Sequence, residues 1–152
     1  MKKLLLILVA FSSISLYSQE LSWETDMSKA VERAEKENKV IMLFFTGSDW
    51  CGWCVRLQNE VFKQADFKTW AQEKVVLVEL DFPRKTPQSE DIKNQNVTLS
   101  QMFEVKGYPT VWFVKPSKAG EKINLEKIGS TGYVAGGPGA WLLGANQILG
   151  VK

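Results

Sequence analysis

Residues 40–54 read VIMLFFTGSDWCGWC, a continuous apolar run followed by a polar break and two cysteines. The run at 40–45 has the length and composition of a strand that is buried on both faces of a sheet. Residues 46–49 interrupt that pattern, and apolar residues at helical spacing resume after the second cysteine. Cys51 is therefore expected at the N-terminus of a helix, with Cys54 one turn later on the same face.

The pattern extends in both directions from this stretch. Upstream, Asp26 is a good N-cap for a helix over 27–37. Downstream, the remaining predicted elements are a helix at 64–72, strands at 75–82, 110–114 and 123–128, and helices near 99–103 and at 140–149. The expected connections are a surface insertion at 83–96, a hairpin turn at 116–120 and a glycine-rich link at 132–139. This alternation predicts one α/β domain.

The first residues have the pattern of a secretory leader. Lys2 and Lys3 precede an apolar run at 4–11, and small and polar residues follow up to Ser18. We expect residues 1–18 to be a signal peptide and residues 19–152 to form the mature domain. The apolar run is too short to anchor the chain in a membrane, so stable membrane insertion is not expected. The protein is predicted to be exported, either periplasmic or secreted.

Charge and composition exclude several classes of function. The chain carries 19 basic and 17 acidic residues, and Lys2 and Lys3 leave with the leader, so the remaining chain has 17 of each sign. A nearly neutral chain without a long basic run has no electrostatic footprint for nucleic acid. The sequence contains no histidine, which removes Ser–His–Asp and Cys–His catalysis.

The two cysteines are separated by only Gly52 and Trp53. A bridge across so short a loop removes little entropy from the unfolded chain, so it is a weak structural staple. Two cysteines without histidine supply half of a tetrahedral zinc site, and Val55 stands where covalent haem attachment needs histidine. No metal or cofactor is therefore expected. Thiol–disulfide exchange remains: a helix N-terminus favours the thiolate of Cys51, and Cys54 is placed to resolve the mixed disulfide.

Two segments together resemble the thioredoxin family. Trp50-Cys51-Gly52-Trp53-Cys54 follows a buried strand, and Gly107-Tyr108-Pro109-Thr110 precedes a later one. The Gly-Ser-Asp-Trp-Cys-Gly-Trp-Cys stretch at 47–54 is most similar to exported thioredoxin-like proteins. The resemblance runs from about residue 26 to residue 149. It implies the thioredoxin fold, a central mixed sheet of four to five strands flanked by helices on both faces.

The resemblance also implies roles around the cysteine pair. Pro109 is expected to be cis and to pack beside the disulfide. Tyr108 and Pro109 are expected to border a groove that pairs with the backbone of a client protein, and Trp50 to shield the site. From their position between the two cysteines, and not from the resemblance, Gly52 is expected to allow a tight entry into the helix and Trp53 to shield one side of the pair.

The chain departs from the family pattern at two positions. Trp53 stands where thioredoxins have proline and protein disulfide isomerases have histidine, which leaves the redox direction open. The buried acid that thioredoxins carry six residues before the first cysteine is replaced here by Phe45. Asp49 and Glu79 are candidate replacements, and the sequence favours neither.

These observations predict a thiol–disulfide oxidoreductase, a reductase or isomerase, that acts on disulfide-containing exported proteins through Cys51 and Cys54. Reduction is favoured, and an exported reductant needs a membrane electron relay as a donor. The protein is expected to be monomeric. The alternative is a thioredoxin-fold module that binds or chaperones client chains, or senses redox state, without turnover.

Overall fold

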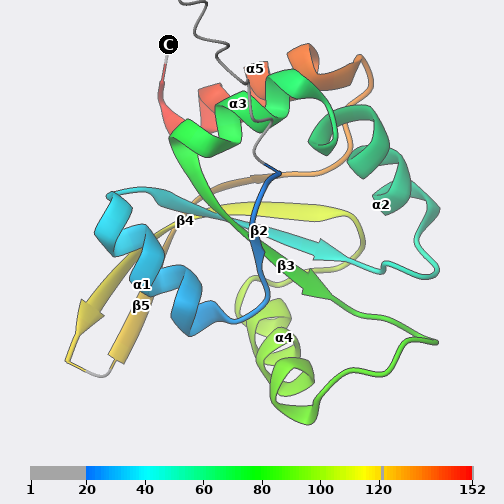
Figure 1. Ribbon diagram of the computed structural model, residues 1–152. Helices are drawn as coiled ribbons and strands as arrows, with labels where there is room; N and C mark the ends of the chain where they lie inside the picture. Colours follow the sequence, from blue (N-terminus) through cyan, green and yellow to red (C-terminus); the bar gives the residue numbers. More distant parts are fainter. Residues whose placement is uncertain (1–19, 121, 152) are drawn as a thin grey trace, which may run out of the picture.

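The computed structural model describes residues 20–120 and 122–151. The predicted signal peptide at 1–18 therefore lies outside the described residues. The described residues form one mixed five-stranded sheet in the order β1-β3-β2-β4-β5, with helices on both faces (Figure 1). The expected architecture is confirmed, with five strands.

The sheet contains both parallel and antiparallel pairs of strands. β3 pairs in parallel with β1 and β2, whereas β4 pairs antiparallel with β2 and β5. The strands are β1 (Trp23–Glu24), β2 (Val40–Thr46), β3 (Val75–Asp81), β4 (Thr110–Ala119) and β5 (Lys122–Thr131). The helices are α1 (Met27–Glu37), α2 (Gly52–Leu57), the π-helical turn η1 (Gln58–Phe62), α3 (Ala65–Lys74), α4 (Glu90–Met102) and α5 (Gly137–Leu149).

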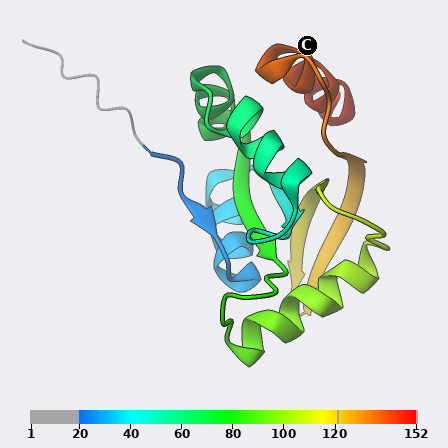
Figure 2. The same ribbon diagram turned by 90° about the vertical axis from the view of Figure 1, so that its right-hand side faces the viewer.

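The sheet separates two hydrophobic cores, with α2, α3 and α5 on one side and α1 and α4 on the other (Figures 1 and 2). Side chains of a strand point alternately to the two faces. In β2, Met42 and Phe44 therefore pack in the first core, whereas Ile41, Leu43 and Phe45 pack in the second. Both cysteines belong to the first core.

One edge of the sheet gathers the segments that surround the cysteines. β2 and β3 are parallel, β4 is antiparallel to β2, and β5 is antiparallel to β4. The C-terminal ends of β2, β3 and β5 and the start of β4 consequently lie at the same edge. The connecting segments at 47–51, 82–86, 107–109 and 132–136 meet there.

The predicted surface insertion at 83–96 is shorter than expected, because α4 already begins at Glu90. The hydroxyl of Ser89 caps this helix by accepting a hydrogen bond from the backbone N–H of Ile92, and acidic residues occupy its first turn. Only Asn96 and Leu99 of the helix are buried. So sparse an apolar face leaves little periodicity in the sequence.

The predicted hairpin turn at 116–120 is also wrong in position. Pro116 lies within β4, opposite Leu125 of β5, and the turn follows Ala119. The pairing of β4 with β2 ends at Val114, so Pro116 lies where β4 has become an edge strand. Proline is tolerated there because no neighbouring strand needs its missing N–H on that side.

Two further elements differ from the predictions. α5 begins at Gly137 instead of residue 140, and the two-residue strand β1 was not anticipated. In the described part of the chain, no helix combines the length and the apolar character needed to cross a membrane.

Candidate active site: the Cys51–Cys54 disulfide

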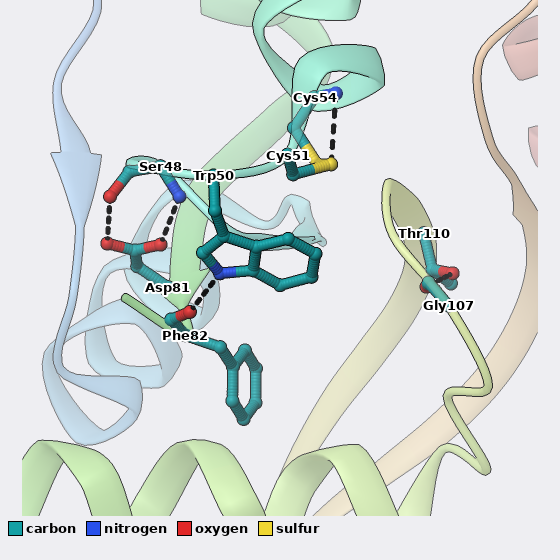
Figure 3. The surroundings of a disulfide bond; sticks show 8 residues. All are labelled: Ser48, Trp50, Cys51, Cys54, Asp81, Phe82, Gly107 and Thr110. Atoms are coloured by element: carbon teal, nitrogen blue, oxygen red, sulfur yellow. Dashed lines mark hydrogen bonds between the residues drawn. A yellow bond between two sulfur atoms is a disulfide. The ribbon is translucent and has the colours of Figure 1, made fainter. Parts of the chain in front are cut away.

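Cys51 and Cys54 form a disulfide at the start of α2, with their Cα atoms 5.3 Å apart. Cys51 is the N-cap of the helix, and its Sγ accepts a hydrogen bond from the backbone N–H of Cys54 at 3.2 Å (Figure 3). The backbone N–H of Cys51 donates to the carbonyl of Gly47 at 2.9 Å, which closes the loop between β2 and α2. The first turn of the helix thus directs an N–H group at the sulfur of Cys51, a position that favours thiolate in the reduced state.

Trp50 is fixed against the segment that follows β3. Its Nε1 donates a hydrogen bond to the carbonyl of Phe82 at 2.8 Å (Figure 3), and the Arg84 guanidinium lies 3.9 Å from the centre of the ring. The ring meets Tyr108 edge-on, with centroids 5.7 Å apart. A Cβ atom at Gly47 would overlap the indole, so glycine permits this close approach. We call Trp50, Phe82, Arg84 and Tyr108 the Trp50 wall.

The Trp53 side chain packs against the segment that follows β5, whereas Trp50 packs against the segment that follows β3. Trp53 is 56% exposed, and its ring centroid lies 5.1 Å from that of Tyr133. The Arg56 guanidinium lies 5.3 Å from the Trp53 ring and 5.1 Å from the Tyr133 ring. Arg56 and Tyr133 each donate a hydrogen bond of 2.6 Å to the carboxylate of Glu60. We call these four residues the Trp53 wall.

The strand order places the two walls on opposite sides of the disulfide, because β3 and β5 flank β2 and β4 in the sheet. Sequence reasoning found Trp50, Trp53 and Tyr108 but missed Arg56, Glu60 and Tyr133. The spacing of Arg56 and Glu60 by four residues indicates a helical ion pair. No local pattern links either residue to Tyr133, which lies in the predicted glycine-rich link.

The Tyr108–Pro109 peptide bond is cis, as the resemblance implies. Partial burial raises the pKa of Tyr108, whose ring also lies 5.3 Å from that of Phe82. A Cβ at Gly132 would lie 3.2 Å from the Pro109 carbonyl oxygen, so the segment after β5 runs directly beside the proline.

The reason expected for glycine at position 52 is wrong. A Cβ atom at Gly52 would meet no other atom within 4 Å, and its φ is not positive. The residue is exposed at the first position of α2. Local packing and backbone geometry therefore do not require glycine at this position.

Asp49 acts as a local cap. Its carboxylate accepts hydrogen bonds from the backbone N–H groups of Arg84, Lys85 and Thr86 at 2.7 to 3.0 Å, and these bonds lower its pKa to about 2. A carboxylate with so low a pKa is a poor proton acceptor near neutral pH. Ser48, one residue earlier, donates two hydrogen bonds to Asp81 (Figure 3). These acids order the loops around the disulfide.

The residue facing the cysteines from β2 is not Phe45. Phe45 packs against Phe103 in the core on the other side of the sheet, with ring centroids 6.2 Å apart. Phe44 shares the cysteines' core, and its partner in β3 is Glu79. Paired residues of neighbouring strands point to the same face, so Glu79 also lies on the side of the cysteines.

Glu79 is half-buried, and among the described residues no hydrogen bond or ion pair reaches its carboxylate. Burial raises its pKa, and the nearby Asp81 raises it further. Glu79 lines an open cavity of about 270 Å³ together with Phe44, Gln58 and Phe62. Within residues 20–120 and 122–151, no group of three or more His, Cys, Asp or Glu side chains is arranged to hold a metal ion.

The sequence matches the profile of the thioredoxin-like domain family over residues 27–135. It is 35% identical over 116 residues to the disulfide bond reductase DsbH of Chlamydia pneumoniae, an alignment that covers 76% of this chain and 69% of that protein. It is 29% identical over 119 residues to the thioredoxin-related protein DsbJ of the same organism. That second alignment spans 78% of this chain but only 33% of the longer relative.

Comparison with solved structures agrees with these sequence matches. A DsbH oxidoreductase superimposes with a TM-score of 0.77 at 30% sequence identity, covering 88% of each chain. A thioredoxin from Thermus thermophilus superimposes with a TM-score of 0.62 at 20% identity, covering 86% of this chain and 88% of the other. The second likeness concerns the fold alone.

Proposed function

The chain belongs to the thioredoxin-like family and is a protein thiol–disulfide oxidoreductase, and on this premise we propose that it reduces disulfides in exported proteins. The observation that carries the proposal is the placement of Cys51 as N-cap of α2, with the Cys54 N–H on its sulfur. The reductase name of the relative from C. pneumoniae supports this direction.

In the proposed reaction, the Cys51 thiolate attacks one sulfur of a client disulfide. A mixed disulfide forms, and the other client cysteine leaves as a thiolate and takes up a proton. The Cys54 thiol then loses its proton and attacks the sulfur of Cys51, which releases the second client thiolate. The client gains two electrons, and the enzyme is left with the Cys51–Cys54 disulfide.

The two walls and the cis-proline segment suit the binding of an unfolded or extended client. Trp50, Gly52, Trp53, Tyr108 and Pro109 surround the approach to Cys51, and the two tryptophans present exposed apolar surface there. Exposed aromatic residues on both sides of a reactive group are typical of surfaces that bind protein segments. We assign client contact to these five residues.

The proposed cycle requires a source of electrons. A disulfide is the product of each turnover, so a donor dithiol must restore the Cys51–Cys54 dithiol. The leader-like segment at 1–18 supports a reaction in the periplasm or outside the cell, away from cytosolic reductants. A membrane protein that carries electrons outward is the proposed donor.

The Cys54→Ser variant tests the order of attack. Expressed as the full chain, it should accumulate mixed disulfides with clients in the exported fraction, because the intermediate on Cys51 cannot be displaced. Cys51→Ser is the matched control and should trap far fewer. More trapping by Cys51→Ser than by Cys54→Ser would reverse the assignment, and equal trapping would contradict a single attacking cysteine. Absence of adducts together with absence of turnover in the wild type would favour a binding module.

Equilibration of the protein with glutathione buffers gives the reduction potential of the Cys51–Cys54 pair, which tests whether the protein reduces or oxidises its clients. A reduction potential near the value of thioredoxin, about −270 mV, would support a reductase. A potential near that of the strong oxidant DsbA, about −120 mV, would contradict it.

A further inference from the structure

Thr46 carries a buried polar atom that has no hydrogen-bond partner in the part of the chain that the structure describes. Among the buried side-chain nitrogen and oxygen atoms of the described residues, its Oγ1 alone makes no hydrogen bond. The backbone of Thr46 is satisfied, since its carbonyl accepts a hydrogen bond from the N–H of Phe82 at 2.9 Å. A buried hydroxyl without a partner is destabilising and therefore needs an explanation.

The position of Thr46 connects this hydroxyl with the disulfide. Thr46 is the last residue of β2 and 0% exposed. It continues the row of Met42 and Phe44 on the face of the sheet that carries the cysteines, and α2 starts over the same end of β2. Alternation along β2 therefore directs the Thr46 side chain to the face of the sheet on which α2 packs.

The two sulfur atoms differ in what surrounds them. The sulfur of Cys51 already accepts the N–H of Cys54, whereas Cys54 is completely buried and no donor among the described residues hydrogen-bonds to its sulfur. Reduction by a donor dithiol breaks the S–S bond, transfers two electrons and leaves the donor as a disulfide. Of the donor's two protons, one passes to solvent because Cys51 is held as a thiolate. The other proton resides on Cys54, which then carries a buried thiol with hydrogen-bonding capacity of its own.

We propose that Thr46 is a positioning residue whose hydroxyl pairs with the Cys54 thiol only in the reduced protein. The hydroxyl is unsatisfied in the disulfide state and satisfied in the dithiol state. The pair therefore shifts the equilibrium of the Cys51–Cys54 couple toward the dithiol and holds the Cys54 sulfur in place. This proposal rests on the thiol–disulfide chemistry alone and holds for either redox direction.

Thr46→Val tests this proposal because it removes the hydroxyl and keeps the shape of the side chain. The equilibrium constant with glutathione should shift about tenfold toward the disulfide, because the variant loses the net free energy of one hydrogen bond. For a two-electron couple, a tenfold shift corresponds to a change of about 30 mV in the reduction potential. Thr46→Ser keeps the hydroxyl and should remain close to the wild type. A Val variant with an unchanged equilibrium constant would overturn the proposal.

Unfolding by urea of the oxidised and the reduced forms separates this role from a purely structural one. Thr46→Val should stabilise the oxidised form relative to the reduced form, because only the oxidised form contains the unpaired hydroxyl. Equal changes in both forms would contradict a redox-dependent bond.

The infrared S–H stretch of Cys54 in the reduced protein gives a readout that does not depend on stability. The Cys54 band should lie at the frequency of a hydrogen-bonded thiol in the wild type and in Thr46→Ser, and should move to that of a free thiol in Thr46→Val. One band position in all three proteins would overturn the proposal. Failure of this proposal would leave the Cys54→Ser trapping experiment unaffected.

Discussion

At the scale of single residues, one step along β2 changes which side chain faces the cysteines. Successive strand residues point to opposite faces, so Phe44 and Phe45 belong to different cores. Counting back from Cys51 selects Phe45 because the count runs through an irregular loop at 47–50. The strand pattern does not determine how that loop is folded, and only the structure shows that Phe44 and its partner Glu79 lie on the cysteine side.

Glu79→Gln should stabilise the protein at pH 8. Burial raises the pKa of Glu79 in the folded chain above its value in the unfolded chain, so the protonated form is favoured by folding. The contribution of Glu79 to stability is greatest below the pKa that its carboxyl has in the unfolded chain. It is lost as the pH rises through the higher pKa of the same carboxyl in the folded chain. Urea unfolding between pH 4 and pH 8 should show an advantage of the glutamine variant that disappears toward pH 4.

The exposed Glu126 on β5 provides the matched control. Glu126→Gln should change stability little across the same range. A stability difference between Glu79→Gln and the wild type that does not vary with pH would show that the carboxylate of Glu79 is not destabilised by burial.

At the scale of elements, short polar signals set where helices begin and end. Asp26 caps α1 by accepting hydrogen bonds from the N–H groups of Ser28 and Lys29, and Asn38 ends it in the left-handed conformation with φ of 51°. Strong apolar spacing accompanies these caps in α1. Its predicted range therefore agrees with the structure, whereas the start of the sparsely apolar α4 was missed.

Asp26→Ala should lower the free energy of unfolding by about 1 kcal/mol, because two backbone donors at the start of α1 lose their acceptor. Urea unfolding measures this loss. Asp26→Ser keeps a capping oxygen and should retain most of the stability. The redox equilibrium with glutathione should stay unchanged in both variants, since α1 packs on the face of the sheet opposite the cysteines. A serine variant as unstable as the alanine variant would exclude capping as the cause.

At the scale of the whole molecule, stability comes from two cores that the sheet separates, and the disulfide contributes little to it. Large aromatic side chains fill the core on the cysteine side, and Trp141 of α5 packs there against Phe62 and Phe67. The loop closed by Cys51 and Cys54 is only four residues long. The bond is thus free to open and close within a scaffold that does not depend on it.

Reduction should therefore lower the free energy of unfolding by no more than about 2 kcal/mol, the loop-entropy value for so short a loop. Urea unfolding of the oxidised and reduced forms measures the difference, and the far-ultraviolet circular dichroism of the two forms should coincide. Unfolding of the protein on reduction would mean that the disulfide is a structural staple after all.

The sequence alone determined the chemistry and most of the architecture. Two cysteines at the start of a helix after a buried strand, and a Tyr-Pro before a later strand, are local patterns. The cysteine pattern and the apolar periodicity predict the redox pair and the α/β fold, because backbone propensity and periodicity act over short stretches of chain. The cis conformation of Pro109 is what the resemblance of the Tyr-Pro segment to the thioredoxin family implies.

The tertiary structure alone decided the surroundings of the disulfide. Tyr133 reaches Glu60 across 73 positions of the chain, Glu79 pairs with Phe44, and Thr46 is buried with no partner for its hydroxyl among the described residues. Each of these depends on how strands from distant parts of the chain align at one edge of the sheet. Register and packing between elements set these contacts, and local propensity carries no information about them.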